Sequence, residues 1–295
     1  MNNSTRNLKM KKLLIASTAL VATAGMASAD ITISGHAAAG IHSGLHDAGG
    51  TTAQADGVFS NAGIDFAMSG ATDNGITFSA SISADAGTEI DQGDFELDGT
   101  DLGHMGLGAV SMTGTFGTLT FDDAGIDNLY NDAYTAADVS YSTTVGAVSL
   151  TVAHDVGGAA DGNSMSAGYT ASGMTFALAA SDAAAGTASR LKVSYALNDA
   201  VSVSGKTDQA AGAESVQTIT ASTTLNGVSV ALSSANNSTW DVDLGYTAGG
   251  FALTYGVDET DGWTATATAA LGGGATFAAG VDSNDSTYAG VSFAF

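Results

Sequence analysis

Proline and cysteine are absent from this chain of 295 residues, and only seven residues are basic. Without cysteine, the fold has neither disulfide bonds nor thiolate metal sites. Without proline, no strand lacks a backbone N–H for the hydrogen-bond ladder of a closed sheet. Charged residues make up only 13% of the chain, whereas glycine contributes 39 residues. This composition does not fit an ordinary soluble α/β enzyme.

The first 29 residues have the layout of a secretory signal peptide. They hold four of the seven basic residues, then an apolar run over 13–26, then three small residues, Ala-Ser-Ala, at 27–29. The apolar run is too short for a membrane-spanning helix, which needs about 20 residues. We therefore predict a signal peptide at 1–29, cleavage before Asp30 and one exported domain at 30–295, with an uncleaved N-terminal anchor as the alternative.

Cleavage leaves a strongly acidic protein. In residues 30–295, three basic residues stand against 30 acidic ones, a net charge of −27. This charge repels nucleic acid and concentrates small cations in any enclosed space. We therefore expect no nucleic-acid partner.

Residues 30–295 have the period-two pattern of β-strands, in segments of about nine to eleven residues. At 240–247 apolar residues alternate with Asp, Gly and Thr, and 251–258 repeats the pattern after Gly249-Gly250, a pair that tolerates positive φ. No stretch has sustained helical apolar spacing. Aromatic residues near strand ends are typical of the girdles of membrane barrels: Trp240, Trp263, Phe251 and Tyr195.

Short turns alternate with longer polar connections. The turns fall at 72–75, 116–117, 145–146, 172–173, 198–199, 226–227, 249–250 and 272–274. The longer connections fall at 44–58, 87–103, 122–137, 156–162, 182–188, 209–214 and 259–262. Eight turns predict eighteen strands. We expect an all-β, transmembrane antiparallel β-barrel with periplasmic turns and extracellular loops, wide enough for an aqueous channel.

Two points of the pattern leave alternatives open. The apolar phase of 104–115 switches between Leu107 and Val110, which predicts either a bulge or a strand that faces a partner subunit. A soluble β-sandwich or repeat adhesin would also alternate. Against it stand the uniform hairpin repeat without a linker and the aromatic residues at strand ends.

Three segments resemble the trimeric general porins of photosynthetic and related alphaproteobacteria. They are DITISG at 30–35, TDNGITF at 72–78 and YAGVSFAF at 288–295. The terminal Phe295, with Phe293 and Val291 on the same face, is similar to the aromatic-ended last strand that barrel-assembly machinery reads. The resemblance implies a 16-stranded homotrimer in the outer membrane of a Gram-negative bacterium, with the third long loop folded into the lumen.

The resemblance also identifies residues of a constriction. FGTLTF at 116–121 is similar to the strand that leads into the inward loop, and 122–137 would then be this loop. Its aspartates and tyrosines, which we expect to face the lumen, are Asp122, Asp123, Asp127, Tyr130, Asp132 and Tyr134. The chain departs from the family pattern in its hairpin count, in its short loop and in its few arginines.

All three basic residues of the exported region lie on the polar face of one hairpin. Pairing about Asn198-Asp199 puts Lys192 opposite Lys206 and Arg190 beside Asp208. We expect this basic patch to line the pore across from the loop, so that opposed charges set up a transverse field. The alternative is that the three cations only relieve acidic repulsion.

Other acidic residues on the polar phase predict a cation-preferring channel. They are Asp65, Asp85, Asp155, Asp241, Asp243, Asp258 and Asp282. No sequence pattern marks a metal, cofactor or catalytic site. The five histidines show no metal-ligand spacing, the Asp-rich segments 94–101 and 258–261 lack EF-hand spacing, and no nucleophile elbow or P-loop occurs.

The sequence thus predicts a porin, and neither an enzyme nor a cofactor-dependent protein. We expect passive diffusion of small hydrophilic solutes and ions through its lumen, with outer-membrane lipids around the barrel. Two alternatives remain: a surface structural or adhesion β-protein without channel activity, and an outer-membrane enzyme.

Overall fold

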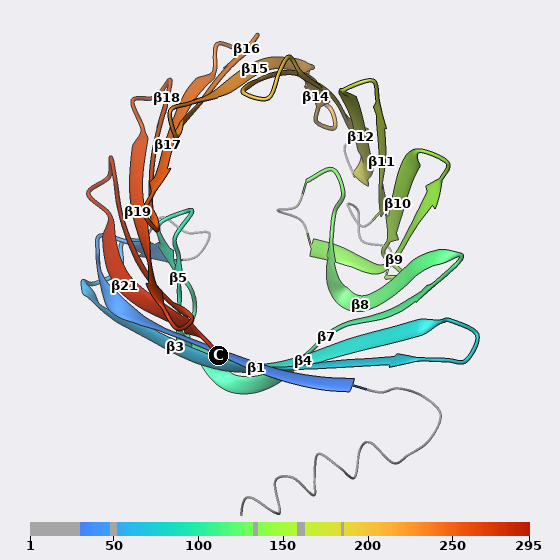
Figure 1. Ribbon diagram of the computed structural model, residues 1–295, viewed down its shortest axis with the longest axis horizontal. Helices are drawn as coiled ribbons and strands as arrows, with labels where there is room; N and C mark the ends of the chain where they lie inside the picture. Colours follow the sequence, from blue (N-terminus) through green and yellow to red (C-terminus); the bar gives the residue numbers. More distant parts are fainter. Residues whose placement is uncertain (1–29, 48–51, 132–134, 158–162, 184–185) are drawn as a thin grey trace, which may run out of the picture.

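The computed structural model describes residues 30–47, 52–131, 135–157, 163–183 and 186–295. In this part of the chain eighteen antiparallel strands form one sheet, which closes because β1 (Asp30–Ser43) pairs with both β3 (Gly57–Ala71) and the last strand, β21 (Thr287–Ala294). Figure 1 looks down this ring of strands. The count of eighteen strands from the turns is confirmed. The sixteen strands implied by the resemblance are wrong for this chain, because eight tight turns and nine other connections alternate along it.

The other strands of the barrel follow one another in chain order around the ring. They are β4 (Thr77–Thr88), β7 (Asp101–Gly114), β8 (Gly117–Asp127), β9 (Thr135–Val145), β10 (Val148–His154), β11 (Asn163–Ala171), β12 (Met174–Ala183), β13 (Gly186–Ala196), β14 (Val201–Gln209), β15 (Val216–Leu225), β16 (Val228–Ala235), β17 (Trp240–Ala248), β18 (Phe251–Asp258), β19 (Trp263–Gly272) and β20 (Ala275–Asp282).

The alternation of each strand separates an apolar outer wall from a polar inner wall. On β17 and β18, Leu244, Tyr246, Leu253 and Tyr255 are exposed on the outside, although they are large and apolar. An apolar outer surface of this kind is what the hydrocarbon core of a membrane requires. Among the described residues, no helix has the length and apolar character needed to cross a membrane.

Tight turns connect the strands at one end of the barrel, called here the turn end. At Asn226-Gly227 φ is +52° and +83°, and at Gly249-Gly250 it is +60° and +86°. Two consecutive positive φ values define a turn whose twist matches that of the flanking strands, and Asn and Gly adopt them at little cost. The predicted hairpins are confirmed at these positions. The longer connections lie at the other end, the loop end.

A bulge interrupts β7 where its apolar phase switches. Val110 pairs with Ala80 and Leu107 pairs with Ile82, so β7 has one more residue than β4 in this interval. The extra residue brings Val110 back to the face of Leu107. The predicted bulge is confirmed.

Three of the predicted loops are shorter than expected. The segment 182–188 is not a long loop, since β12 continues to Ala183 and β13 begins at Gly186. Within 122–137, β8 continues to Asp127 and β9 begins at Thr135. Backbone pairing across these polar residues explains the difference, because Asp and Gly do not prevent a strand from extending when its neighbour offers free partners.

The third of these segments, 87–103, folds into structure of its own. It contains β5 (Ile90–Asp91) and β6 (Glu96–Leu97), which pair with each other, and β6 also pairs in parallel with β2 (His46–Asp47). Figure 1 shows β5 inside the ring, on the inner side of the strands near β21. An apolar core lies there, between this small sheet and the inner wall.

Candidate functional site

The basic patch has the pairing that the sequence predicts. On β13 and β14, Lys192 pairs with Lys206 and Arg190 pairs with Asp208. The neighbouring residues Leu191 and Tyr195 have the opposite phase and are exposed on the apolar outside. The basic side chains therefore lie on the inner wall.

One carboxylate binds two of the three cations. The Nε of Arg190 donates to Oδ2 of Asp208 at 2.9 Å, and Nζ of Lys206 lies 3.5 Å from the same oxygen. Asp208 is only 17% exposed, so water screens these interactions less than at an open surface. Within the described residues, no ion pair involves Lys192.

A residue of the predicted inward loop completes this cluster. The hydroxyl of Tyr130 donates to Oδ1 of Asp208 at 2.6 Å, and the guanidinium carbon of Arg190 lies 4.9 Å from the centre of the Tyr130 ring. This is the distance of a cation–π contact. Burial, and then the hydrogen bond to Asp208, raise the pKa of Tyr130 to about 12, so its hydroxyl remains a donor at neutral pH.

The segment that precedes β9 follows the inner wall. The backbone N–H of Leu129 donates to Oγ of Ser164 on β11 at 2.9 Å, and the buried Asn128 accepts from the N–H groups of Tyr130 and Asn131. Figure 1 shows the residues that directly follow β8, 128–131, inside the ring. The expectation that this loop stands across from the basic patch is wrong at Tyr130, which touches the patch. The Tyr130 side chain is long enough to reach the wall and make this contact. Strand periodicity gives no information about such a contact, because Tyr130 lies outside the strands.

The other predicted residues of the loop lie in different surroundings. Asp122 and Asp123 lie in a stretch of β8 that bulges between two paired residues, Phe121 and Ile126, and Asp127 ends the strand. The Asp122 carboxyl folds over Gly125 and fills the space that a Cβ atom would need there. Asp132 and Tyr134 lie outside the described residues.

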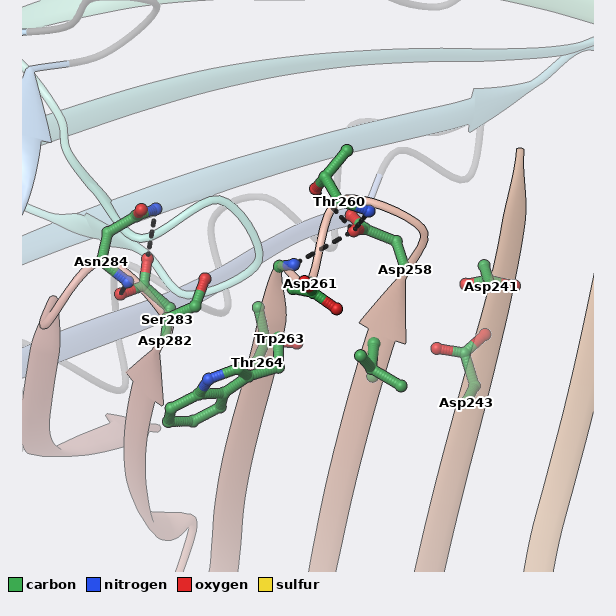
Figure 2. Close-up of a pocket in the computed structure, with 13 residues that line it drawn as sticks. Asp241, Asp243, Asp258, Thr260, Asp261, Trp263, Thr264, Asp282, Ser283 and Asn284 are labelled. Atoms are coloured by element: carbon green, nitrogen blue, oxygen red, sulfur yellow. Dashed lines mark hydrogen bonds between the residues drawn. The ribbon is translucent and has the colours of Figure 1, made fainter. Parts of the chain in front are cut away.

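A second polar site lies on the inner wall at the loop end of β17 to β20. It is a pocket of about 640 Å³ (Figure 2), and its carboxylates come from adjacent strands and their connections. They are Asp241, Asp243, Asp258, Asp261 and Asp282. Four of these five were predicted from strand phase to face the lumen. Asp261 lies in a turn, where period-two reasoning gives no orientation.

The acidic pocket contains like charges at close range. Asp241 pairs with Asp258 across β17 and β18, and none of the described residues that line the pocket is basic. Several carboxylates receive hydrogen bonds that hold them in place: Asp241 accepts from Ser233 at 2.8 Å, and Asp282 accepts from the N–H of Ser286 at 2.8 Å. A wall of fixed carboxylates attracts cations and repels anions.

The remaining predicted acidic residues are spread over the ring. Asp85 on β4 lies 3.1 Å from Nε2 of His36 on β1, and Asp65 on β3 lies 3.7 Å from Nδ1 of the same ring. Asp155 is buried at the loop end of β10, where it accepts from the N–H of Gly157. In the part of the chain that the structure describes, no group of three or more His, Cys, Asp or Glu side chains could hold a metal ion.

The last residues close the barrel. Val291 and Phe293 lie on the outer face of β21, and Phe293 is exposed. Phe295 exchanges backbone hydrogen bonds with Gly35 of β1, at 2.7 and 2.9 Å, and the residue is 78% exposed. The predicted assembly residues thus share one outer face beside the first strand.

Comparison with known proteins agrees with this architecture. The family described as Gram-negative porin matches residues 16–294. No curated protein matches the sequence. A triple mutant of the Rh. blastica porin is similar in structure, with a TM-score of 0.54 and 15% identity over 90% of this chain and 100% of that chain.

Two further solved structures give the same result. Another mutant of the Rh. blastica porin has a TM-score of 0.53 and 17% identity, over 90% of this chain and 100% of that chain. A porin refined at 1.8 Å resolution has a TM-score of 0.50 and 18% identity, with the same coverage. At these identities the likeness concerns the fold.

Proposed function

Because this chain belongs to the Gram-negative porin family, as an outer-membrane channel protein and not an enzyme, we propose that it passes small hydrophilic solutes and prefers cations. The single observation that carries the preference is the acidic pocket of the inner wall, where five carboxylates gather and no described lining residue is basic. Fixed charges of one sign in a narrow passage raise the local concentration of the opposite ion.

The basic patch offsets this field only in part. Asp208 balances one of its three positive charges, so a net charge of +2 stands against the five carboxylates of the acidic pocket. We infer that Arg190, Lys192 and Lys206 line the pore, and that the segment 122–137 narrows it along the wall of β11 to β14. Tyr130 contacts the patch directly. This contact favours a loop that is fixed to the wall, and it does not favour a loop that faces the patch across the pore with a transverse field between them.

Reversal potential in a planar bilayer under a salt gradient tests this function. Protein purified from outer membranes should give stable conductance steps and a reversal potential that favours cations. Anion preference would refute the acidic-lumen argument, and silence from a folded barrel would favour the structural or adhesive alternative.

A pair of matched variants assigns the preference to the pocket. Asp241→Asn with Asp243→Asn should shift the reversal potential toward zero, because two carboxylates of the inner wall become neutral while their shape is kept. The control is Asp73→Asn with Asp199→Asn, two exposed residues at the turn end, and it should have a smaller effect. Equal shifts in both variants would refute a special role of the pocket.

We also propose that the barrel is a homotrimer and that barrel-assembly machinery reads Val291, Phe293 and Phe295. Their shared outer face beside β1 supports this role. Phe295→Ala should lower the amount of folded barrel in outer membranes, measured by heat-modifiable gel mobility, while refolding in detergent stays close to wild type. Cross-linking in native membranes tests the trimer.

A further inference from the structure

An apolar core lies inside the barrel, where a water-filled lumen would be expected to be polar throughout. Its large members are Leu45, Phe59, Ile90, Phe95 and Tyr288, all buried. Phe59 and Tyr288 come from the inner faces of β3 and β21, and the other three come from the connections at the loop end. Two connections have therefore folded onto the inner wall at the place where the ring closes.

Residues 89–98, called here the ledge, cover this core on the side that faces the lumen. Phe95 is buried, with its ring centre 5.3 Å from that of Tyr288, and the Tyr288 hydroxyl donates to the carbonyl of Gln92 at 3.4 Å. Phe95 has a φ of +58°, an uncommon value for a residue with a Cβ atom. Such a backbone persists where surrounding packing compensates for it, and here burial of the ring does so.

Glycines of the inner wall make room for the two aromatic rings that the wall itself contributes to this core. At Gly280 a Cβ atom would clash with the Tyr288 ring, and at Gly290 it would clash with the Phe59 ring. Two glycines of the wall thus leave the space that the wall's own aromatic side chains fill. These rings form part of the apolar surface on which Phe95 of the ledge packs.

We propose that the ledge is a second, fixed narrowing of the channel, and that Asp91 and Asp94 on it contribute to the selection of cations. This inference rests on the proposed function as a diffusion channel. The ledge cannot swing away from the wall without exposing its apolar side chains to lumenal water, which is unfavourable. It therefore occupies part of the cross-section permanently, independently of residues 128–131, which contact β11 and β14.

The charge of the ledge has the sign of the neighbouring wall. Asp91 and Asp94 are exposed, and residues 89–98 contain no basic residue. The ledge packs on β20 and β21, and the acidic pocket occupies the adjoining wall of β17 to β20. A cation that enters from the loop end thus passes carboxylates on two surfaces, one on the wall and one on the ledge.

Excision of the ledge tests the narrowing directly. The backbone N–H of Asp98 donates to the carbonyl of Glu89 at 3.0 Å, so the two ends of the ledge are already adjacent. Replacement of residues 90–97 by two glycines should keep the barrel closed. We expect single-channel conductance to rise roughly 1.5-fold or more, and larger neutral polymers to enter, because conductance follows the open cross-section. Unchanged conductance and polymer cutoff in a folded barrel would overturn the inference.

Charge variants test the second part and do not depend on the excision. Asp91→Asn with Asp94→Asn keeps the apolar core. The amide oxygen introduced at position 91 can still accept from the two N–H groups that Asp91 now caps, at 2.8 and 3.3 Å. The reversal potential should shift toward zero, and the control pair at Asp73 and Asp199 should shift it less. Equal shifts, or no shift, would overturn the role in cation selection.

Measurements on the wild-type protein show whether a negative result refutes the proposed function or only the ledge inference. If wild-type protein gives no conductance, the proposed function fails. If it conducts with cation preference and both ledge variants behave like wild type, only the ledge inference fails. If the excised protein does not fold, the charge variants still decide the role of the ledge in cation selection.

Discussion

Asp208 shows how much one side chain can organise on the inner wall. One of its oxygens accepts from Arg190 and lies near Lys206, and the other accepts from Tyr130. Hydrogen bonds to a charged group are stronger than those between neutral groups. Asp208 therefore joins the strands β13 and β14 to the segment between β8 and β9.

Tyr130→Phe should loosen this segment without a change in charge. The variant loses a hydrogen bond to a carboxylate, which contributes about 1.5–3 kcal/mol, and keeps the ring over Arg190. We expect larger fluctuations of the open-channel current at unchanged ion preference. Tyr169→Phe, on the outer wall, is the matched control. Identical current noise in all three proteins would show that Tyr130 does not fix the loop.

The raised pKa of Tyr130 predicts an alkaline limit for the same contact. Since the folded state favours the protonated phenol, with a pKa of about 12 against 10.0, its stabilising contribution is complete below pH 10 and is lost as the pH rises through 12. Spectroscopic titration should show one tyrosine that ionises after the others. That late phase should be absent from Tyr130→Phe, and its persistence would assign it to another residue.

At the scale of elements, two segments lie against the inner wall and are held there by different interactions. Residues 128–131 are held by polar contacts with Ser164 and Asp208, whereas the ledge is held by burial of apolar side chains around Phe95. Polar contacts weaken with salt and charge loss, and apolar contacts do not. The two elements should therefore respond differently to salt.

Phe95→Ala should destabilise the ledge. Truncation of a buried Phe costs roughly 3–5 kcal/mol, from lost burial and the cavity that remains. We expect a lower temperature for loss of the compact, heat-modifiable form, and greater access of protease to residues 89–98. Phe251→Ala removes a ring from the exposed outer wall and should have a smaller effect. An unchanged protease pattern would show that Phe95 does not anchor the ledge.

At the scale of the whole molecule, the first strand begins at the residue that directly follows the predicted signal peptide. β1 begins at Asp30, whose partner on β3 is Ser69. We expect the intact mass of the protein from outer membranes to correspond to residues 30–295, because the predicted signal peptide ends at residue 29. A mass that includes residues before Asp30 would contradict this cleavage site.

The sequence alone determined the strand pattern of the barrel. Period-two alternation and positive-φ turns, such as Gly249-Gly250, are local properties, so eighteen strands and the bulge of β7 could be predicted without any tertiary contact. Cross-strand pairs such as Lys192 with Lys206 followed too, because a tight turn fixes the register of its hairpin.

Only the tertiary structure decided what fills the ring. The contact of Tyr130 with Asp208 joins residues 78 positions apart, and the ledge residue Gln92 meets Tyr288, which lies 196 positions later in the chain. Phe95 and Leu45 lie in connections without periodicity, so no local pattern indicates that they are buried. Closure of the ring brings these segments to the inner wall, and packing at that wall, which depends on distant residues, then determines the shape of the lumen.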